Sequence, residues 1–188
     1  MPNIDFAELN REIERRGAGW KAVPTTVSML SEGDFSNLLG VVVDRADVEA
    51  ANAEARERVA DIGVGAPPAF DWRNVGGRNF VTSVKDQRDC GSCVSFGACA
   101  CVESAVAIKN PGTIVDLSEA DLHFCSSHGA NCGGWWPSKA LEAVKSRGVA
   151  DDACFPYFTA FDASKPPKPS CKACTDRDDR AYKITGYT

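Results

Sequence analysis

Two cysteines, Cys90 and Cys93, lie three residues apart at the start of an apolar segment. Between Val94 and Ile108, apolar residues recur at steps of four, three, four and three: Val94, Ala98, Cys101, Ala105 and Ile108. This spacing predicts a helix with one apolar face and with Cys93 in its first turn. Unpaired backbone N–H groups and the helix dipole favour negative charge there, and the thiolate is the reactive form of cysteine. The stretch therefore predicts a nucleophile.

The same pair of cysteines is compatible with two other kinds of chemistry. Cys-x-x-Cys at a helix start is also the redox motif of thiol oxidoreductases, in which Cys90 and Cys93 would form a reversible disulfide. Cys-x-x-Cys is also often one half of a zinc site. These four residues alone leave all three interpretations open.

Cys90-Gly91-Ser92-Cys93 resembles the active-site signature of the papain family of cysteine peptidases, Cys-Gly-(Ser/Ala)-Cys followed by an aromatic residue. Here Val94 replaces the aromatic residue. Gln87 lies where the family keeps its oxyanion-hole glutamine. The resemblance implies that Cys93 and Gln87 are catalytic and that Gly91 and Ser92 belong to the substrate site.

A second segment, Cys132 to Pro137, is similar to the Gly-Gly segment of that family. The resemblance assigns Gly133 and Gly134 to the substrate main chain, because glycine lets a backbone approach closely. It assigns Trp135 and Trp136 to the pocket for the second residue before the cut, with core packing as the alternative for both rings. It also implies a disulfide between Cys90 and Cys132, which would leave Cys93 free.

The elements that must position these residues are mainly helices. Periodicity, capping and composition predict helices over 5–16, 44–61, 94–108 and 138–147, a helix start at Ser118 and a strand over 182–188. The 44–61 helix is expected to be mostly exposed. Cys99 and Cys101 are expected to be buried small apolar residues of the 94–108 helix.

The first third of the chain differs in composition from the rest. Residues 1–65 contain no cysteine and carry twelve acids against seven Lys and Arg, a net charge of −5, whereas the remainder is balanced. A basic patch for nucleic acid is absent, and no apolar run reaches the roughly 18 residues that a membrane span needs. We therefore expect neither a nucleic-acid nor a membrane partner.

A Gly/Pro linker, Gly63 to Pro68, divides the chain into an acidic N-terminal segment (1–65) and a second domain (66–188). Asp71-Trp72-Arg73 then resembles the start of a mature papain-like enzyme. The resemblance implies that 1–65 is a pro-segment that inhibits the enzyme intramolecularly, and that a maturation cut falls between Ile62 and Ala69. An extended stretch between Trp20 and Gly40 would lie near Gly134 and Trp135. An unrelated helical appendage is the alternative.

Nine cysteines are many for a reducing cytosol and predict a secreted protein or another oxidising compartment, although Met1 to Phe6 has no signal-peptide character. The odd count suits one free nucleophile and up to four bridges. Four later cysteines can form two disulfides of open connectivity or, alternatively, a zinc site: Cys125, Cys154, Cys171 and Cys174. The favoured interpretation needs no metal or organic cofactor.

A peptidase of this kind also needs a histidine, and the two present, His123 and His128, match no catalytic position of the family. We therefore expect an α+β, papain-like fold, here mostly the helical left-hand lobe plus a helical pro-segment, truncated before most of the β-rich lobe. The expected function is a cysteine endopeptidase proenzyme acting on peptides or proteins, with this chain inactive by itself. The alternatives are a catalytically dead peptide-binding module and a Cys90/Cys93 oxidoreductase.

Overall fold

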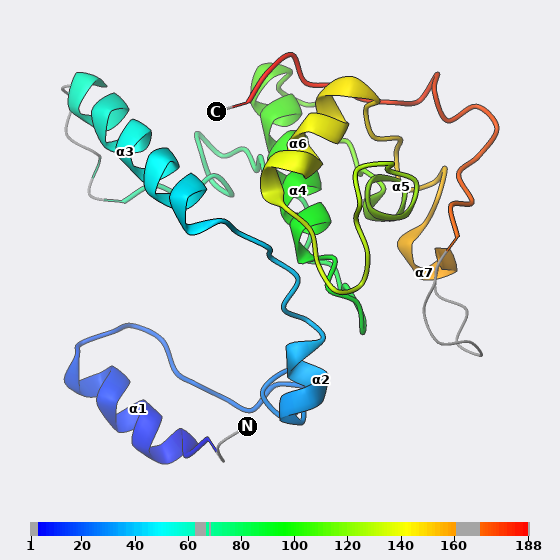
Figure 1. The fold of residues 1–188 in the computed structure, drawn as a ribbon. Coiled ribbons are helices and arrows are strands. Elements are labelled where there is room, and N and C mark those ends of the chain that lie inside the picture. Colours follow the sequence, from blue (N-terminus) through cyan, green and yellow to red (C-terminus); the bar gives the residue numbers. More distant parts are fainter. Residues whose placement is uncertain (1–3, 63–66, 68, 161–169, 188) are drawn as a thin grey trace.

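The computed structural model describes residues 4–62, 67, 69–160 and 170–187. Within them the chain forms seven helices (Figure 1): α1 (Phe6–Arg15), α2 (Glu32–Ser36), α3 (Arg45–Ile62), α4 (Cys93–Lys109), α5 (Glu119–Phe124), α6 (Pro137–Ser146) and α7 (Tyr157–Ala160). The helices expected over 5–16, 44–61, 94–108 and 138–147 are confirmed to within one or two residues, as is the helix start at Ser118. The short helices α2 and α7 were not predicted.

Helices α4 to α7 form the packed body of the molecule, in which α5 packs against α4, α6 and α7, and α4 also packs against α6 (Figure 1). The core buries one side of α4 against α5, α6 and the segments between them: Val94, Ala98, Cys99, Val102, Val115, Leu117, Leu122, Trp135, Ala140, Ala143, Val144 and Val149. Each large side chain buried in this way contributes about 1.5–3 kcal/mol. This packing fixes α4, and therefore Cys93, in the lobe.

The buried face of α4 differs from the one expected. Val94 and Ala98 are buried, but Cys101, Ala105 and Ile108 are exposed, while Val102 and Ala107 face the core. The segment is apolar around most of its circumference, so spacing alone does not select the side that packs. Cys99 is buried as expected, and the expectation for Cys101 is wrong.

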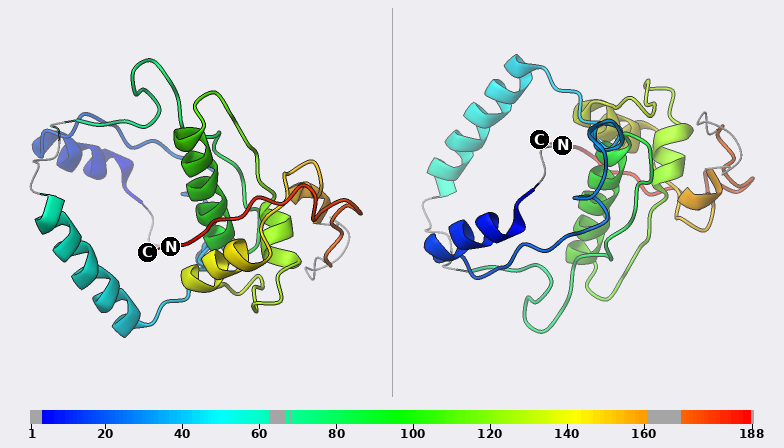
Figure 2. Two further views of the ribbon diagram at one scale, coloured as in Figure 1. Left: turned by 90° about the horizontal axis from the view of Figure 1, so that it is seen from above. Right: turned by 90° about the horizontal axis from the view of Figure 1, so that it is seen from below.

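Helices α1 to α3 stand apart from this body, as Figures 1 and 2 show, and among the described residues they pack against no other helix. Asp5 caps α1 by accepting hydrogen bonds from the Ala7 and Glu8 N–H groups, and Ile13 is the buried residue of this helix. Ser31 caps α2 in the same way. The described side chains of α3 are exposed, as expected. These helices are therefore held by local interactions.

Backbone pairing between segments is limited to isolated bridges in the described residues. The strand expected over 182–188 is wrong: Tyr182 pairs with Val149 in one antiparallel bridge, and the chain then continues without a neighbour to pair with. None of the described helices combines the length and apolar character needed to cross a bilayer.

Three disulfides staple the lobe: Cys90–Cys132, Cys125–Cys171 and Cys154–Cys174. The first is the pair that the family resemblance implied. The other two resolve the connectivity that the sequence left open and exclude a zinc site on those four thiols. Cys93, Cys99 and Cys101 remain free, in agreement with the expectation that Cys99 and Cys101 form no bridge. The linker expected at 63–68 lies outside the described residues apart from Pro67.

Candidate active site

Cys93 is the first residue of α4, and its thiol is free and partly exposed. The neighbouring Cys90 is completely buried and bonded to Cys132, so the two motif cysteines are not joined to each other. Packing of α4 in the core fixes the Cys93 backbone at the end of the helix, where the dipole favours an anion. The arrangement can hold one reactive thiolate.

The Gln87 side chain lies beside this helix start. Its amide nitrogen Nε2 donates to the backbone oxygen of Cys90 at 2.8 Å and to that of Leu38 at 3.0 Å. An amide that can donate to a backbone carbonyl oxygen can equally stabilise the oxygen of a tetrahedral intermediate. In this structure that donor is occupied by Leu38, from the N-terminal segment.

Gly40, Gly91 and Gly134 let the backbone of the N-terminal segment lie in close contact with the backbone beside Cys93. A Cβ added to Gly40 would lie 1.9 Å from the Gly91 oxygen, and one added to Gly134 would lie 2.6 Å from the Gly40 oxygen. Gly134 also has a φ of 125°, which other residues rarely adopt. Gly133 donates its N–H to Asn131 Oδ1 at 2.8 Å and forms the turn that precedes Gly134.

The segment from Leu38 to Val42 therefore lies across the site. It overlaps the end of the stretch expected between Trp20 and Gly40 and continues two residues beyond it. The Trp135 N–H donates to the Gly40 oxygen at 2.8 Å, and the Val42 N–H donates to the Trp135 oxygen at 2.9 Å. Val41 and Trp135 form the corresponding parallel bridge. The main chain beside Gly134 is thus occupied by the N-terminal segment.

The two tryptophans separate into different roles. The Trp135 side chain is fully buried in the core and donates its indole N–H to the His128 oxygen at 2.9 Å, so its expected place in a pocket wall is wrong. Trp136 is 36% exposed and borders a cavity of about 490 Å³, which Val42 and Leu141 also line. Only Trp136 has a side chain available to a ligand there.

Ser92 was also assigned to the substrate site, but its side chain is completely buried. Its Oγ lies 2.6 Å from the Tyr157 hydroxyl. The Ser92 side chain therefore faces the interior, and only its backbone adjoins the nucleophile.

Among the described residues neither histidine contacts the Cys93 thiol. His123 is buried, with Nδ1 2.9 Å from Ser95 Oγ and Nε2 4.0 Å from the bridged sulfur of Cys90. Burial lowers the pKa of His123 to about 4, although a hydrogen bond with the Asn131 backbone opposes the change. A ring with this pKa stays neutral at pH 7, and its role here is structural.

A cluster of charges, not anticipated from the sequence, anchors the segment that leads to Gln87. Lys85 Nζ lies 2.7 Å from Glu119 Oε1 and 2.5 Å from Asp116 Oδ1, and Glu103 lies 3.6 Å away. Burial raises the pKa of Glu119 to about 7, against the opposing effect of its hydrogen bond with Lys85. The sequence predicted a helix start at Ser118 but no partner for Glu119.

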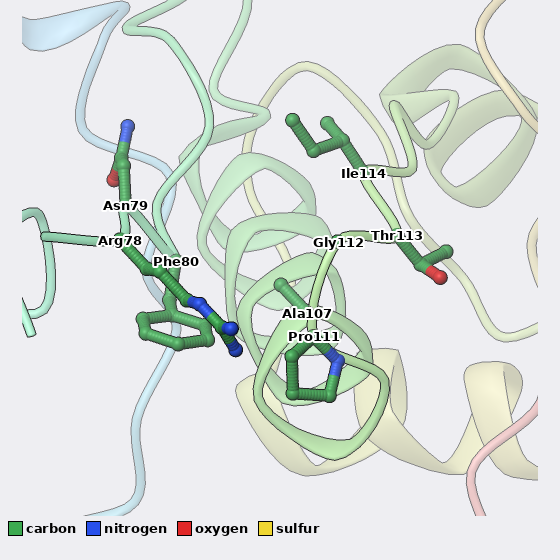
Figure 3. Close-up of a pocket in the computed structure, with 8 residues that line it drawn as sticks. All are labelled: Arg78, Asn79, Phe80, Ala107, Pro111, Gly112, Thr113 and Ile114. Carbon is green, nitrogen blue, oxygen red and sulfur yellow. The ribbon is translucent and has the colours of Figure 1, made fainter. Parts of the chain in front are cut away.

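A further cavity of about 410 Å³ lies at the other end of α4 (Figure 3). Its lining includes Ala107 on α4, the Pro111–Ile114 turn and Phe80. Since Ala107 is fourteen residues from Cys93, the cavity is roughly 21 Å along the helix from the thiol. It is separate from the candidate active site.

Comparison with known proteins adds the family. Residues 66–188 match the profile "Papain family cysteine protease". The chain is 40% identical over 122 residues to stem bromelain of Ananas comosus, covering 64% of this chain and 51% of that protein. It is 33% identical over 185 residues to a cathepsin L-like proteinase of Phaedon cochleariae, covering 97% of this chain and 52% of that protein. The chain thus spans about half the length of these curated relatives.

Solved structures of precursors resemble the whole chain. A recombinant stem bromelain precursor superposes with a TM-score of 0.57 and 27% identity, over 97% of this chain and 54% of that one. Procathepsin L 3 of Tenebrio molitor gives a TM-score of 0.63 at 23% identity, over 96% of this chain and 53% of that one, and supports the fold alone. The α+β class expected from the sequence is that of these structures, of which the described residues form the helical part. The chain belongs to the papain family of cysteine proteases.

Proposed function

We propose that the chain is the pro-segment (residues 1–65) and the first part of the peptidase domain (66–188) of a cysteine endopeptidase zymogen. Cys93 would attack a peptide carbonyl carbon, and the Gln87 side chain with the Cys93 N–H would stabilise the oxyanion. The observation that carries the proposal is the Leu38 carbonyl oxygen on Gln87 Nε2, beside a free thiol at a helix start. A backbone carbonyl already lies where the reacting carbonyl would be held.

The pro-segment would inhibit by covering this site. Its Gly40 and Val42 use both the N–H and the oxygen of Trp135, while the N–H of Gly134 donates to Asn131 within the turn. A substrate main chain would thus pair with Trp135, one residue beyond the glycines that the family resemblance assigned. Because the pro-segment is tethered, its effective concentration at the site is high and modest contacts suffice. The three disulfides support an oxidising compartment for the mature protein.

Two alternatives remain distinguishable. The oxidoreductase needs a Cys90–Cys93 disulfide, whereas Cys90 is bonded to Cys132. A catalytically dead binding module would retain the cleft without acyl transfer to Cys93. Acylation of the thiol therefore separates the binding module from the peptidase.

The test is acylation by a peptidyl p-nitrophenyl ester after proteolytic cutting of the linker between Ile62 and Ala69. We expect one equivalent of nitrophenolate per chain, an acyl group mapped to Cys93, and a rate about 10²–10³-fold lower in Gln87→Ala. The control Cys101→Ser should acylate normally, because Cys101 lies on the exposed side of α4. Acylation that is absent, or that ignores Gln87→Ala, would contradict the proposal.

A further inference from the structure

The Tyr157 hydroxyl lies between two groups of the active-site loop. It donates to the Gln87 backbone oxygen at 2.8 Å and lies 2.6 Å from Ser92 Oγ. A carbonyl oxygen can only accept, so the single phenolic proton goes to Gln87 and the phenolic oxygen accepts from Ser92. Burial raises the pKa of Tyr157, so this proton is retained. The result is a directed chain from Ser92 through Tyr157 to Gln87.

This chain changes what Ser92 does at the start of α4. Ser92 is the N-cap residue, and a serine there usually accepts a hydrogen bond from a backbone N–H of the first turn. No such side-chain bond is present, because the Ser92 hydroxyl is directed to Tyr157 instead. The Ser92 side chain therefore does not compete with an anion for the amides beside Cys93.

The residue after Gln87 also needs support from outside the loop. Arg88 has a φ of 54°, and it is the non-glycine residue with positive φ in the described part of the chain. The left-handed conformation costs about 1–2 kcal/mol for such a residue. The Arg88 guanidinium carbon lies 4.7 Å from the centroid of the Phe158 ring. Tyr157 and Phe158 of α7 thus contact Gln87 and Arg88, respectively.

Helix α7 is itself fixed to the lobe. The Tyr157 ring packs edge-on against Phe96 of α4, with ring centroids 4.8 Å apart. The Cys154–Cys174 disulfide lies three residues before Tyr157. The phenolic oxygen is therefore presented from a rigid frame.

We propose that Tyr157 is a positioning residue for the oxyanion hole: its hydroxyl fixes the peptide group of Gln87 and keeps the Ser92 hydroxyl off the amides at the start of α4. The term oxyanion hole rests on the proposed function, whereas the positioning of the Gln87 side chain can be measured independently of it. Tyr157 touches no reacting atom and acts through Gln87.

The test uses the fact that Gln87 is the single glutamine of the chain. Labelling the full chain with ¹⁵N-glutamine gives a single pair of side-chain NH₂ signals in an NMR spectrum, one for each proton of the amide. Both its protons are hydrogen-bonded, to Leu38 and Cys90, so we expect slow exchange with solvent. Tyr157→Phe keeps the ring packing and should raise the exchange rate at least tenfold. The control Tyr182→Phe, at a ring 38% exposed, should not change it.

Ser92→Ala provides a second variant should Tyr157→Phe not fold. In this variant Tyr157 loses the hydrogen bond from Ser92 but still donates to Gln87. The exchange rate of the Gln87 side-chain amide should therefore rise less than in Tyr157→Phe, by about threefold. Unchanged Gln87 signals in a folded Tyr157→Phe protein with a lowered Tm would assign Tyr157 a purely structural role and overturn the proposal, as would an unchanged rate in Ser92→Ala. The acylation experiment tests the proposed function separately. If Cys93 is not acylated but Tyr157→Phe still speeds exchange of the Gln87 amide, the peptidase function is wrong and the positioning role of Tyr157 stands.

Discussion

Replacing Gly40 with alanine should uncover the Cys93 thiol in the intact chain. The new Cβ would lie 1.9 Å from the Gly91 oxygen and 2.7 Å from its Cα, and both are backbone atoms that cannot rotate away. Since real Cβ contacts do not fall below 3.0 Å, the segment would have to leave its place on the loop.

The expected size follows from three hydrogen bonds that hold this segment: Gln87 to Leu38, Trp135 to Gly40 and Val42 to Trp135. Each contributes about 0.5–1.5 kcal/mol, so loss of all three weakens coverage by roughly 1.5–4.5 kcal/mol. Since 1.4 kcal/mol corresponds to tenfold, the uncovered population should rise about 10- to 10³-fold.

The assay is the rate of alkylation by iodoacetamide, followed by mass mapping of each thiol. Cys93 should react at least tenfold faster in Gly40→Ala than in the original chain. Cys101, exposed on the same helix, serves as an internal reference and should react equally in both.

Gly19→Ala is the matched control, because a Cβ there would meet nothing within 4 Å. It should leave the Cys93 rate unchanged. Equal Cys93 rates in Gly40→Ala and the original chain would refute the reasoning, since the segment would then not limit access to the thiol. A similar acceleration in Gly19→Ala would point to general loosening of the pro-segment.

Four further predictions concern the pH dependence of stability, a buried charge network and turnover. Because the folded chain keeps His123 neutral to about pH 4 while the unfolded chain protonates near 6.5, His123→Val should gain about 2 kcal/mol of stability relative to the original chain between pH 7 and 5 in urea titrations. Glu119 has a raised pKa of about 7 in the folded chain, so its protonation stabilises the original chain as the pH falls from 7 to 5. Glu119→Gln cannot gain this stability and should lose about 2 kcal/mol relative to the original chain over that range. For either variant, a pH curve parallel to that of the original chain would contradict the prediction. Asp121→Asn leaves Arg147 and Arg177 without their buried carboxylate and should lower the free energy of unfolding by about 3–5 kcal/mol. The control Asp178→Asn removes an exposed partner of Arg177 and should change it little. Equal Tm values for the two variants would contradict the importance of the buried network. Peptide turnover by the 188-residue chain should be negligible, as general acid–base help worth about 10²–10⁴-fold is missing; brisk hydrolysis lost in Cys93→Ala would disprove this.

The sequence predicted the elements whose signals are local. Ser118 caps α5, as expected, by accepting a hydrogen bond from the Asp121 N–H, and Gly148, with a φ of 76°, ends α6. A cap or a C-terminal glycine acts within one turn, so neighbouring residues suffice to identify it. The position of the segment near Gly134 had no local signal: a family resemblance placed it between Trp20 and Gly40, and the hydrogen bonds run from Leu38 to Val42.

Features that depend on tertiary contacts were missed. The exposed side of α4 carries Cys101 and Ala105, which are as apolar in sequence as the buried Ala98 and Cys99. Only the packing of α5 and α6 decides between the two sides. The charge cluster at Lys85 likewise joins residues up to 34 positions apart, and no local pattern links them.

The same atoms serve the covered and the uncovered states of the proposed site. Gln87 Nε2 donates to Leu38 while the pro-segment is in place, and it would donate to the oxyanion once the segment leaves. Inhibition and catalysis therefore compete for one donor and cannot occur together. Tyr157 fixes the backbone of Gln87, and a side chain on a fixed backbone has less conformational freedom to lose when it donates to either acceptor. Both interactions would therefore be stronger. Tyr157→Phe should thus weaken inhibition by the pro-segment and also lower the rate of acylation. Gly40→Ala should weaken inhibition alone.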